Sequence, residues 1–210
     1  MADRLVRITY FLEDFAHEQF VPPLVERIAQ EMNIHQERVN IGIRQSTFSR
    51  GNQVIVDFRR FLRDSWQALP VDLVVLCVDG NSKGPQEKRR ELVAAVQKAP
   101  TPIRVVFAIP DPHIEHWYLA DLKALKMVLN APITIAVPTL NRERNYYKHL
   151  LEKACQDAGR VVPQGGAEYG RDIVAGMNVT QARKMPSLKA FLDELRPALQ
   201  AIWRTIQPQP

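Results

Sequence analysis

Short apolar runs alternate with longer amphipathic segments over the first 130 residues, and this alternation constrains the fold more than any other feature. Runs rich in β-branched and aromatic residues predict strands at 5–12, 39–46, 71–79 and 103–110. Apolar residues at helical spacing predict helices at 17–32, 51–69, 86–99 and 113–129. Because strands that alternate with helices pair in parallel, we expect an α/β fold with a mainly parallel sheet and helices on both faces.

Two prolines complicate the first of these helices. Pro22 and Pro23 fall inside segment 17–32, and proline is tolerated only in the first turn of a helix. We therefore expect the regular helix to begin near Pro22, with residues 14–21 forming a turn or a short separate helix.

The chain changes character after residue 138. The run ITIAVP at 133–138 is compatible with one more strand, and segments 145–158 and 185–206 predict amphipathic helices. A glycine-rich stretch, VPQGGAEYGRD, lies between these helices and predicts a loop. We expect an α/β domain over residues 1–138 and a C-terminal helical extension packed on it over residues 139–210.

Composition limits the class of protein only loosely. The formal net charge is +5, which is compatible with nucleic acid as a partner and equally with many proteins that have no such role. Cys77 and Cys155 form no C-x-x-C pair, and we expect buried thiols in a reducing compartment. No apolar run approaches the ~20 residues of a membrane span, and no signal peptide is evident. We expect a soluble, cytoplasmic protein without a membrane partner.

Acidic residues follow three of the predicted strands. Glu13 and Asp14 end the first strand, Asp79 ends the third, and Asp111 and Glu115 follow the fourth. The carboxyl ends of parallel strands meet at one rim of a sheet, where ligands bind. Carboxylates gathered there repel one another unless a cation lies between them, and hard divalent ions prefer oxygen ligands. The joint pattern predicts a site for Mg²⁺ or Mn²⁺.

Each acid also has a simpler explanation. Asp79 alone suits a turn or a helix cap, and Asp111, which lies between two prolines, suits the same roles. Glu115 is favourable near a helix N-terminus for reasons of the helix dipole. His113 and His116 flank it, but they lack the i, i+4 pair of H-E-x-x-H, so zinc is not favoured.

These motifs resemble the Toprim domain of topoisomerases, primases and OLD-family nucleases, in which one strand ends in E-G and a later strand ends in D-x-D. Within that group, the chain is similar to a small prokaryotic family that is often encoded beside an ABC/AAA-type ATPase in phage-defence settings. The matching segments are EDFAHEQFV (13–21), VDLVVLCVDGN (71–81), IPDPHIEHWYLAD (109–121) and SLKAFLDELR (187–196). The resemblance implies a Toprim-like Rossmannoid fold.

The resemblance also implies a metal-dependent nuclease that hydrolyses phosphodiester bonds, as the effector subunit of an ATPase-coupled defence system. The implied metal ligands are Glu13, Glu18, Asp79, Asn81 and Glu115. The flexible cation Lys83, in GNSKG, would contact phosphate, and the catalytic set would be Glu13, Asp79, Glu115 and Lys83. The implied partners are nucleic acid, DNA before RNA, and the ATPase, and a homo-oligomer is compatible with this arrangement.

Four positions depart from the family pattern. Asp14 replaces its glycine, Ala16 its threonine, His17 its next acid, and Asn81 the second acid of D-x-D. Asparagine coordinates through its amide oxygen but brings no negative charge. Two alternatives follow. One is an unusual metal site that favours Mn²⁺, which accepts imidazole more readily than Mg²⁺ does. The other is a non-catalytic scaffold or regulatory subunit that binds the ATPase or nucleic acid. A nucleotide-handling enzyme ranks lower, because no nucleotide fingerprint is present.

Basic residues near these motifs are candidates for contacts with nucleic acid. They follow the second strand and the aspartate strand: Arg44, Arg50, Lys83, Lys88 and Arg89. The alternative is a set of solvated, basic helix faces.

Overall fold

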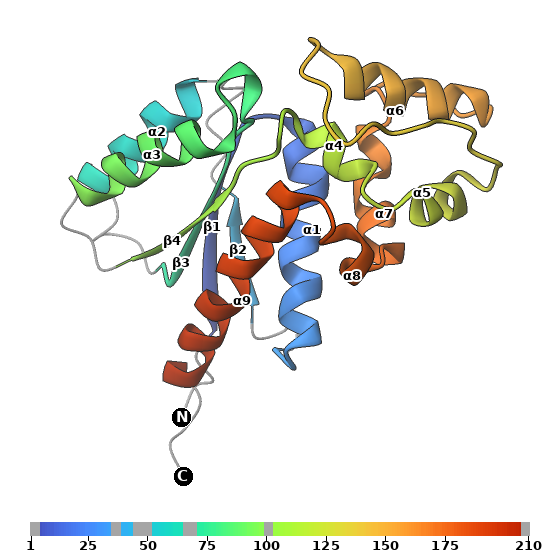
Figure 1. The fold of residues 1–210 in the computed structure, drawn as a ribbon. Coiled ribbons are helices and arrows are strands. Elements are labelled where there is room, and N and C mark those ends of the chain that lie inside the picture. Colours follow the sequence, from blue (N-terminus) through green and yellow to red (C-terminus); the bar gives the residue numbers. More distant parts are fainter. Residues whose placement is uncertain (1–4, 35–38, 44–51, 65–70, 99–102, 207–210) are drawn as a thin grey trace.

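The computed structural model describes residues 5–34, 39–43, 52–64, 71–98 and 103–206 (Figure 1). Its core is a four-stranded sheet in the order β2-β1-β3-β4 in which all neighbours are parallel. The strands are β1 (Val6–Leu12), β2 (Val39–Ile43), β3 (Leu73–Cys77) and β4 (Arg104–Ala108). The four predicted strands are thus confirmed, although residues 44–46 of the second prediction lie outside the described part of the chain.

Helices cover both faces of the sheet, which confirms the predicted α/β class. Helices α2 (Asn52–Asp64) and α3 (Pro85–Gln97) lie on one face, and α1 (Phe15–Glu31) and α9 (Pro186–Ile206) lie on the other (Figure 1). The predicted ends of two helices, at residues 69 and 99, fall outside the described residues.

Side chains of β1, β3 and β4 alternate between two hydrophobic clusters, as strand geometry requires. In β3, Val75 and Cys77 point to the cluster under α1 and α9, whereas Val74 and Leu76 point to the cluster under α2 and α3. All four side chains are fully buried. A strand covered on both faces has no polar positions, which is why this run reads as continuously apolar in the sequence.

The first helix corrects the expectation drawn from its prolines. Helix α1 runs unbroken from Phe15 and contains Pro22 and Pro23 in its interior. Every residue from Phe20 to Val25 is buried, so tertiary packing on all sides outweighs the missing N–H groups. Because Pro23 has no N–H, the carbonyl of Gln19 is left without its usual intrahelical partner, and Gly170 of a later helix packs closely against it.

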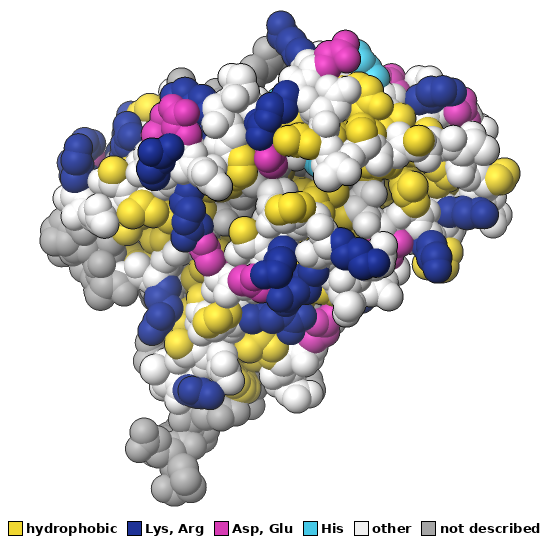
Figure 2. Space-filling view, viewed as in Figure 1, with side chains coloured by type: hydrophobic (Ala, Val, Ile, Leu, Met, Phe, Trp, Pro, Cys, Tyr) yellow, Lys and Arg dark blue, Asp and Glu magenta, His cyan; other side chains and the backbone are white. Residues whose placement is uncertain are grey.

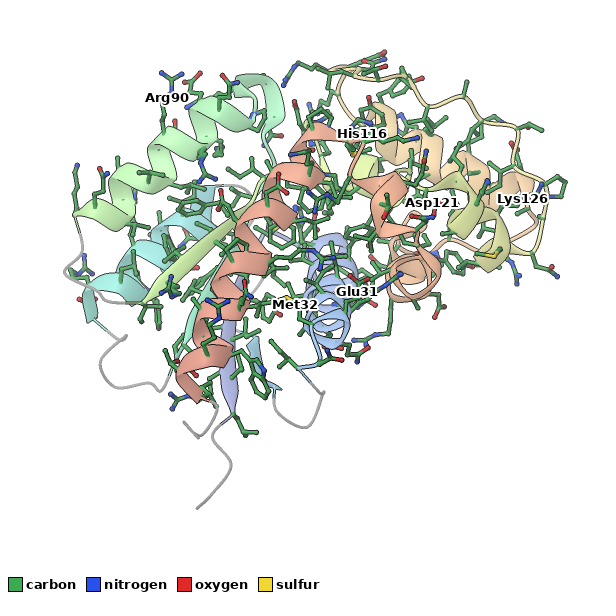
Figure 3. The ribbon with its side chains drawn as sticks, turned by 60° about the horizontal axis from the view of Figure 1, so that its bottom comes forward. Glu31, Met32, Arg90, His116, Asp121 and Lys126 are labelled. Carbon is green, nitrogen blue, oxygen red and sulfur yellow. The ribbon has the colours of Figure 1, made fainter. Side chains whose placement is uncertain are left out.

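The predicted helix over 113–129 is wrong as a single element, since it is broken into α4 (Ile114–Tyr118) and α5 (Leu122–Leu129). Asp121 is the reason for the break. Its carboxylate accepts from the backbone N–H groups of Lys123 and Ala124, which caps α5. It also accepts from Asn178 N at 2.7 Å, which ties α5 to the C-terminal helices (Figure 3).

The C-terminal segments also differ in part from expectation. The predicted helices there correspond to α6 (Tyr146–Asp157) and α9, but residues 133–138 form no strand. The glycine-rich stretch predicted as a loop contains the short helix η4 (Ala167–Tyr169) and the start of α7 (Gly170–Gly176), and α8 (Val179–Ala182) follows. These elements lie against α1 and α4 and share one hydrophobic cluster with the sheet (Figure 1). The division into domains at residue 138 stays a prediction.

Two glycines in α7 provide a matched test of this packing. A Cβ at Gly170 would meet Tyr118 Oη at 2.5 Å and the Gln19 carbonyl at 2.8 Å, whereas a Cβ at Gly176 would make only ordinary contacts, the nearest at 3.6 Å. We expect Gly170→Ala to lower the free energy of unfolding by about 1–3 kcal/mol, because backbone must move. Gly176→Ala should be neutral or stabilise by up to about 1 kcal/mol. Urea unfolding followed by circular dichroism measures both, and equal effects would show that α7 does not pack on α1 as described.

Among the described residues, no helix is both long and apolar enough to cross a bilayer.

Candidate metal centre

The candidate site lies where the strand order reverses. The chain passes from β1 to β2 on one side and then returns to β3 on the other side of β1, and ligands of open α/β sheets bind outside the carboxyl ends of strands at such a switch point. Glu13 and Asp14 follow β1, and Asp79 follows β3, with Leu12 and Cys77 paired in register. The topology therefore brings together acids that are 66 residues apart in the chain.

Three side chains form a compact cluster at this point. One ligand atom each from Glu13, His17 and Asp79 can be chosen so that all lie within 4.8 Å of one another. His17 Nε2 lies 3.1 Å from Asp79 Oδ1, and Glu13 Oε2 accepts from the Asp79 backbone N–H at 3.0 Å. His17 and Asp79 are buried, and Glu13 is half-buried. Glu13 and Asp79 were expected here from the sequence, whereas His17 was expected only in the alternative of an unusual site that favours Mn²⁺.

The first turn of α1 explains how His17 reaches the cluster. Asp14 is the N-cap of α1, and its carboxylate accepts from the backbone N–H of His17. The same carboxylate lies 2.7 Å from His17 Nδ1, which holds the ring with Nε2 towards Asp79. Asp14 and His17 are three residues apart, and this N-cap spacing at a helix start was the sequence signal that could have joined the two side chains.

The imidazole of His17 lies between two carboxylates. Burial opposes its protonation, but its interactions with Cys77, Asp79 and Asp14 hold its pKa well above the usual value. Burial raises the pKa of the Cys77 thiol, so that thiol stays neutral. The rise in the pKa of His17 therefore comes from the two carboxylates. Burial would raise the pKa of Asp14, but the hydrogen bond with His17 outweighs it and lowers that pKa to about 2. Without a metal ion, this raised pKa favours the protonated form of His17, in which both ring nitrogens can donate to the carboxylates.

A second imidazole contacts the same aspartate. His113, which precedes α4, places Nδ1 3.1 Å from Asp79 Oδ2. This hydrogen bond raises the pKa of His113. Burial would raise the pKa of Asp79, but His17 and His113 outweigh it and lower that pKa. Asp79 is therefore the centre of the site, and the two imidazoles favour its ionised form.

Two glutamates complete the charge pattern of the rim. Burial and the charge of Asp79 raise the pKa of Glu13, and the same two causes raise the pKa of Glu115. Glu115 lies in the first turn of α4 and is not a member of the three-residue cluster. Its charge interacts with that of Asp79, and its predicted role as a metal ligand stays a prediction.

The donor set fits a metal ion. Cis ligands of one ion at about 2.1 Å lie about 3 Å apart and trans ligands about 4.2 Å apart, so the cluster within 4.8 Å would contract by up to about 2 Å when it binds an ion. Loss of the Nε2 proton from His17 would free that nitrogen as a ligand. Asp14 would then accept a hydrogen bond from Nδ1 of His17, and metal-binding histidines commonly have such a carboxylate partner. The cluster can therefore hold a metal ion.

Two further predicted ligands do not belong to this cluster. The exposed Asn81 turns its amide nitrogen towards the Asp79 carbonyl, at 3.2 Å. Glu18 lies one residue beyond His17 on α1 and is likewise not a member of the cluster.

The predicted phosphate-binding cations contact carboxylates of the protein itself. Lys83 Nζ lies 2.6 Å from Glu91 Oε1, Lys88 is buried near the same carboxylate, and Arg89 pairs with Glu194 of α9. Figure 2 shows the same pattern more widely, with basic side chains next to acidic ones over the visible face. The other two cations, Arg44 and Arg50, lie outside the described residues.

Comparisons with known proteins give one match. Residues 12–196 match the domain of unknown function DUF4276. A search of curated proteins and a search of solved structures find no match. The matched span begins at the last residue of β1 and ends within α9, so it includes the whole metal cluster and most of the C-terminal helices. The chain belongs to the DUF4276 family.

Proposed function

We propose that this protein is a metal-dependent nuclease of the Toprim type, which hydrolyses phosphodiester bonds with Mg²⁺ or Mn²⁺. The observation that carries the proposal is the cluster of Glu13, His17 and Asp79 at the switch point of a parallel sheet, with Glu115 at the same rim. The resemblance of the strand-end motifs to Toprim domains supports the same chemistry.

The ligand chemistry favours Mn²⁺ over Mg²⁺. Two carboxylates offer hard oxygen atoms, but His17 offers a nitrogen, and imidazole suits transition metals better than it suits Mg²⁺. When bound, such an ion would supply a nucleophilic water and neutralise charge on the phosphate.

The residues of the chain then have separate roles. Glu13, His17 and Asp79 hold the ion, and Asp14 orients the ring of His17. Glu115 has a raised pKa because of burial and Asp79, so it can hold a proton closer to neutral pH than an ordinary glutamate and deliver it to the leaving oxygen. The proposed phosphate contact of Lys83 requires its ammonium group to leave Glu91.

The proposed partners follow from the resemblance. Nucleic acid, DNA before RNA, is the substrate, and an ABC/AAA-type ATPase controls the nuclease as part of a defence system. Association into a homo-oligomer is compatible with this arrangement.

One observation favours a second candidate, a scaffold or regulatory subunit that has lost catalysis. His17 already lies between Asp14 and Asp79, with Nδ1 2.7 Å and Nε2 3.1 Å from their oxygens, and its raised pKa favours the charged form that would offset their repulsion. An internal cation of this kind would hold the carboxylates together without a metal ion.

Cleavage assays test the proposal. The purified protein, alone and with a neighbouring ATPase, is incubated with plasmid DNA and with RNA in Mn²⁺ or Mg²⁺. We expect Mn²⁺-dependent cleavage that falls by at least about 100-fold in Glu13→Gln, because a ligand charge is lost. Glu152→Gln, on α6 and away from the rim, is the matched control and should cleave normally. Absence of cleavage in every condition, despite Mn²⁺ binding, would support the scaffold instead.

A further inference from the structure

The C-terminal part of the chain contributes one side chain to the rim of the metal centre. Arg142 lies in the segment between α5 and α6, which has no regular secondary structure. Its Nη1 donates to the Asn81 carbonyl at 2.8 Å, and its Nη2 donates to Asp111 Oδ2 at 3.0 Å. The guanidinium therefore joins two loops that are 61 and 31 residues away in the sequence.

These two loops carry one residue of the three-residue cluster and two further residues of its rim. The loop after β3 contains Asp79, and the turn after β4 leads to His113 and Glu115. Two backbone hydrogen bonds already connect them: Gly80 N donates to Pro110 O at 2.8 Å, and Asn81 N donates to Pro112 O at 2.9 Å. Arg142 adds one charge-assisted hydrogen bond to each loop, and such bonds are stronger than neutral ones.

A glycine lies next to the guanidinium group of Arg142. Gly84, in the loop after β3, has a φ of +76°, and a Cβ there would lie 3.2 Å from Arg142 Nη2. A glycine at this position therefore serves both the turn and the close approach of the arginine. Both features indicate a built contact and not a chance ion pair on the surface.

The segment that carries Arg142 is itself held in place by α4 and α6. Tyr147 of α6 is fully buried and stacks on His116 of α4, with ring centroids 4.0 Å apart. Tyr147 Oη accepts from Asn141 N at 2.7 Å, which fixes the residue directly before Arg142. His116 Nδ1 in turn donates to the Asp111 carbonyl at 2.7 Å (Figure 3). Asp111 is thus held through its carbonyl by His116 and through its carboxylate by Arg142.

We propose that Arg142 is a positioning residue of the metal centre. It joins the loop after β3 to the turn after β4 and so holds Asp79 close to His113 and Glu115. The part of this inference that concerns metal binding rests on the proposed function. The part that concerns the two loops does not. Arginine suits the role because its planar fork reaches a carbonyl and a carboxylate at once, which the point charge of lysine cannot do.

Hydrogen exchange in the metal-free protein tests whether Arg142 joins the two loops. Amide exchange of Gly80 and Asn81 is measured by NMR in the wild type, in Arg142→Gln and in Arg142→Lys. We expect exchange at both amides to be at least about tenfold faster in Arg142→Gln, with an intermediate value in Arg142→Lys, because local opening is easier without the charged hydrogen bonds. Amides of β1 and β3 should be unchanged, which also shows that each variant is folded.

Arg160→Gln is the matched control. Arg160 also holds a distant backbone carbonyl, that of Leu129, through Nε at 3.1 Å and Nη2 at 3.0 Å, but it does so away from the rim. Exchange at Gly80 and Asn81 should stay within about twofold of the wild type in this variant. Unchanged exchange in Arg142→Gln would show that Arg142 does not hold the two loops together, whether or not the protein binds Mn²⁺.

Mn²⁺ titration by calorimetry tests the positioning role. We expect the Kd for Mn²⁺ to rise about tenfold in Arg142→Gln, the lower end of what outer-shell partners contribute, to recover in part in Arg142→Lys, and to stay unchanged in Arg160→Gln. Faster exchange with an unchanged Kd would overturn the positioning role and leave the proposed nuclease intact. If the wild type itself binds no Mn²⁺, the proposed function fails and the positioning role fails with it, while the exchange data still decide whether Arg142 joins the loops.

Discussion

Asp79→Asn is expected to abolish Mn²⁺ binding and Mn²⁺-dependent cleavage, and to weaken the metal-free protein as well. Asp79 is buried between His17 and His113, and its neighbours hold its pKa below the usual value. Removal of one partner from a buried ion pair costs about 3–5 kcal/mol. We expect a loss of about 3 kcal/mol in the free energy of unfolding, at the lower end of this range, because Asp14 still pairs with His17.

Urea unfolding with and without Mn²⁺ separates the two effects of this substitution. Mn²⁺ at 100 times its Kd should stabilise the wild type by about 2.7 kcal/mol, and this increment should vanish in Asp79→Asn. Asp157→Asn is the control, because Asp157 forms an exposed pair with Lys153 on α6. The control should change stability by less than about 0.5 kcal/mol and keep the full Mn²⁺ increment.

The results also distinguish the two candidate functions. A variant that keeps the Mn²⁺ increment would show that Asp79 is not a ligand, which contradicts the proposed site. A wild type without any Mn²⁺ increment, combined with a destabilised Asp79→Asn, would mean that His17 serves as a permanent internal cation. The scaffold would then be the better description.

Trp117→Ala is expected to lower the free energy of unfolding by about 3–5 kcal/mol, because it removes a large aromatic side chain from a closed core. Trp117 is fully buried in α4, stacks on Phe191 of α9 at 5.6 Å, and packs beside Phe20 of α1 at 6.1 Å. Its indole N–H donates to Ser187 Oγ at 2.8 Å, and truncation would leave that hydroxyl without this partner. The loss is a large part of the ~5–15 kcal/mol that stabilises an ordinary domain.

Trp203→Ala provides a control with the same change in side chain. Trp203 lies near the end of α9 and is only partly buried at the edge of the same cluster, so we expect a loss of about 1–2 kcal/mol from the smaller area returned to water. Urea unfolding followed by circular dichroism and by tryptophan fluorescence should give coincident transitions for the wild type. Equal losses in the two variants would show that α4 and α9 do not share a closed core.

The strands and the acids that follow them were predictable, because each depends on residues that are neighbours in the sequence. β3 is a run of apolar residues bounded by Asp72 and Asp79, and that pattern is enough to indicate a strand buried on both faces. The parallel pairing then places Glu13 and Asp79 at one rim without further information.

Other features were not predictable, since packing between distant segments outweighs local preference. Pro22 and Pro23 disfavour a helix locally, yet α1 continues through both because every residue from Phe20 to Val25 is buried. The contacts of His17 were not predictable for a related reason, although an imidazole ligand was one of the alternatives. A histidine reads as a departure from an acidic motif until Asp14 and Asp79 are seen on its two nitrogens.

By itself, the sequence determined the strand-helix alternation, the parallel sheet and the acidic rim, because these follow from the periodicity of side chains over a few residues. Only the tertiary structure decided what the rim contains. His17 replaces the predicted Glu18 in the cluster, Lys83 pairs with Glu91, and Arg142 reaches the loops of Asn81 and Asp111. The physical reason is that hydrogen bonds and ion pairs depend on distances of about 3 Å between side chains, and only the folded chain sets such distances between segments tens of residues apart.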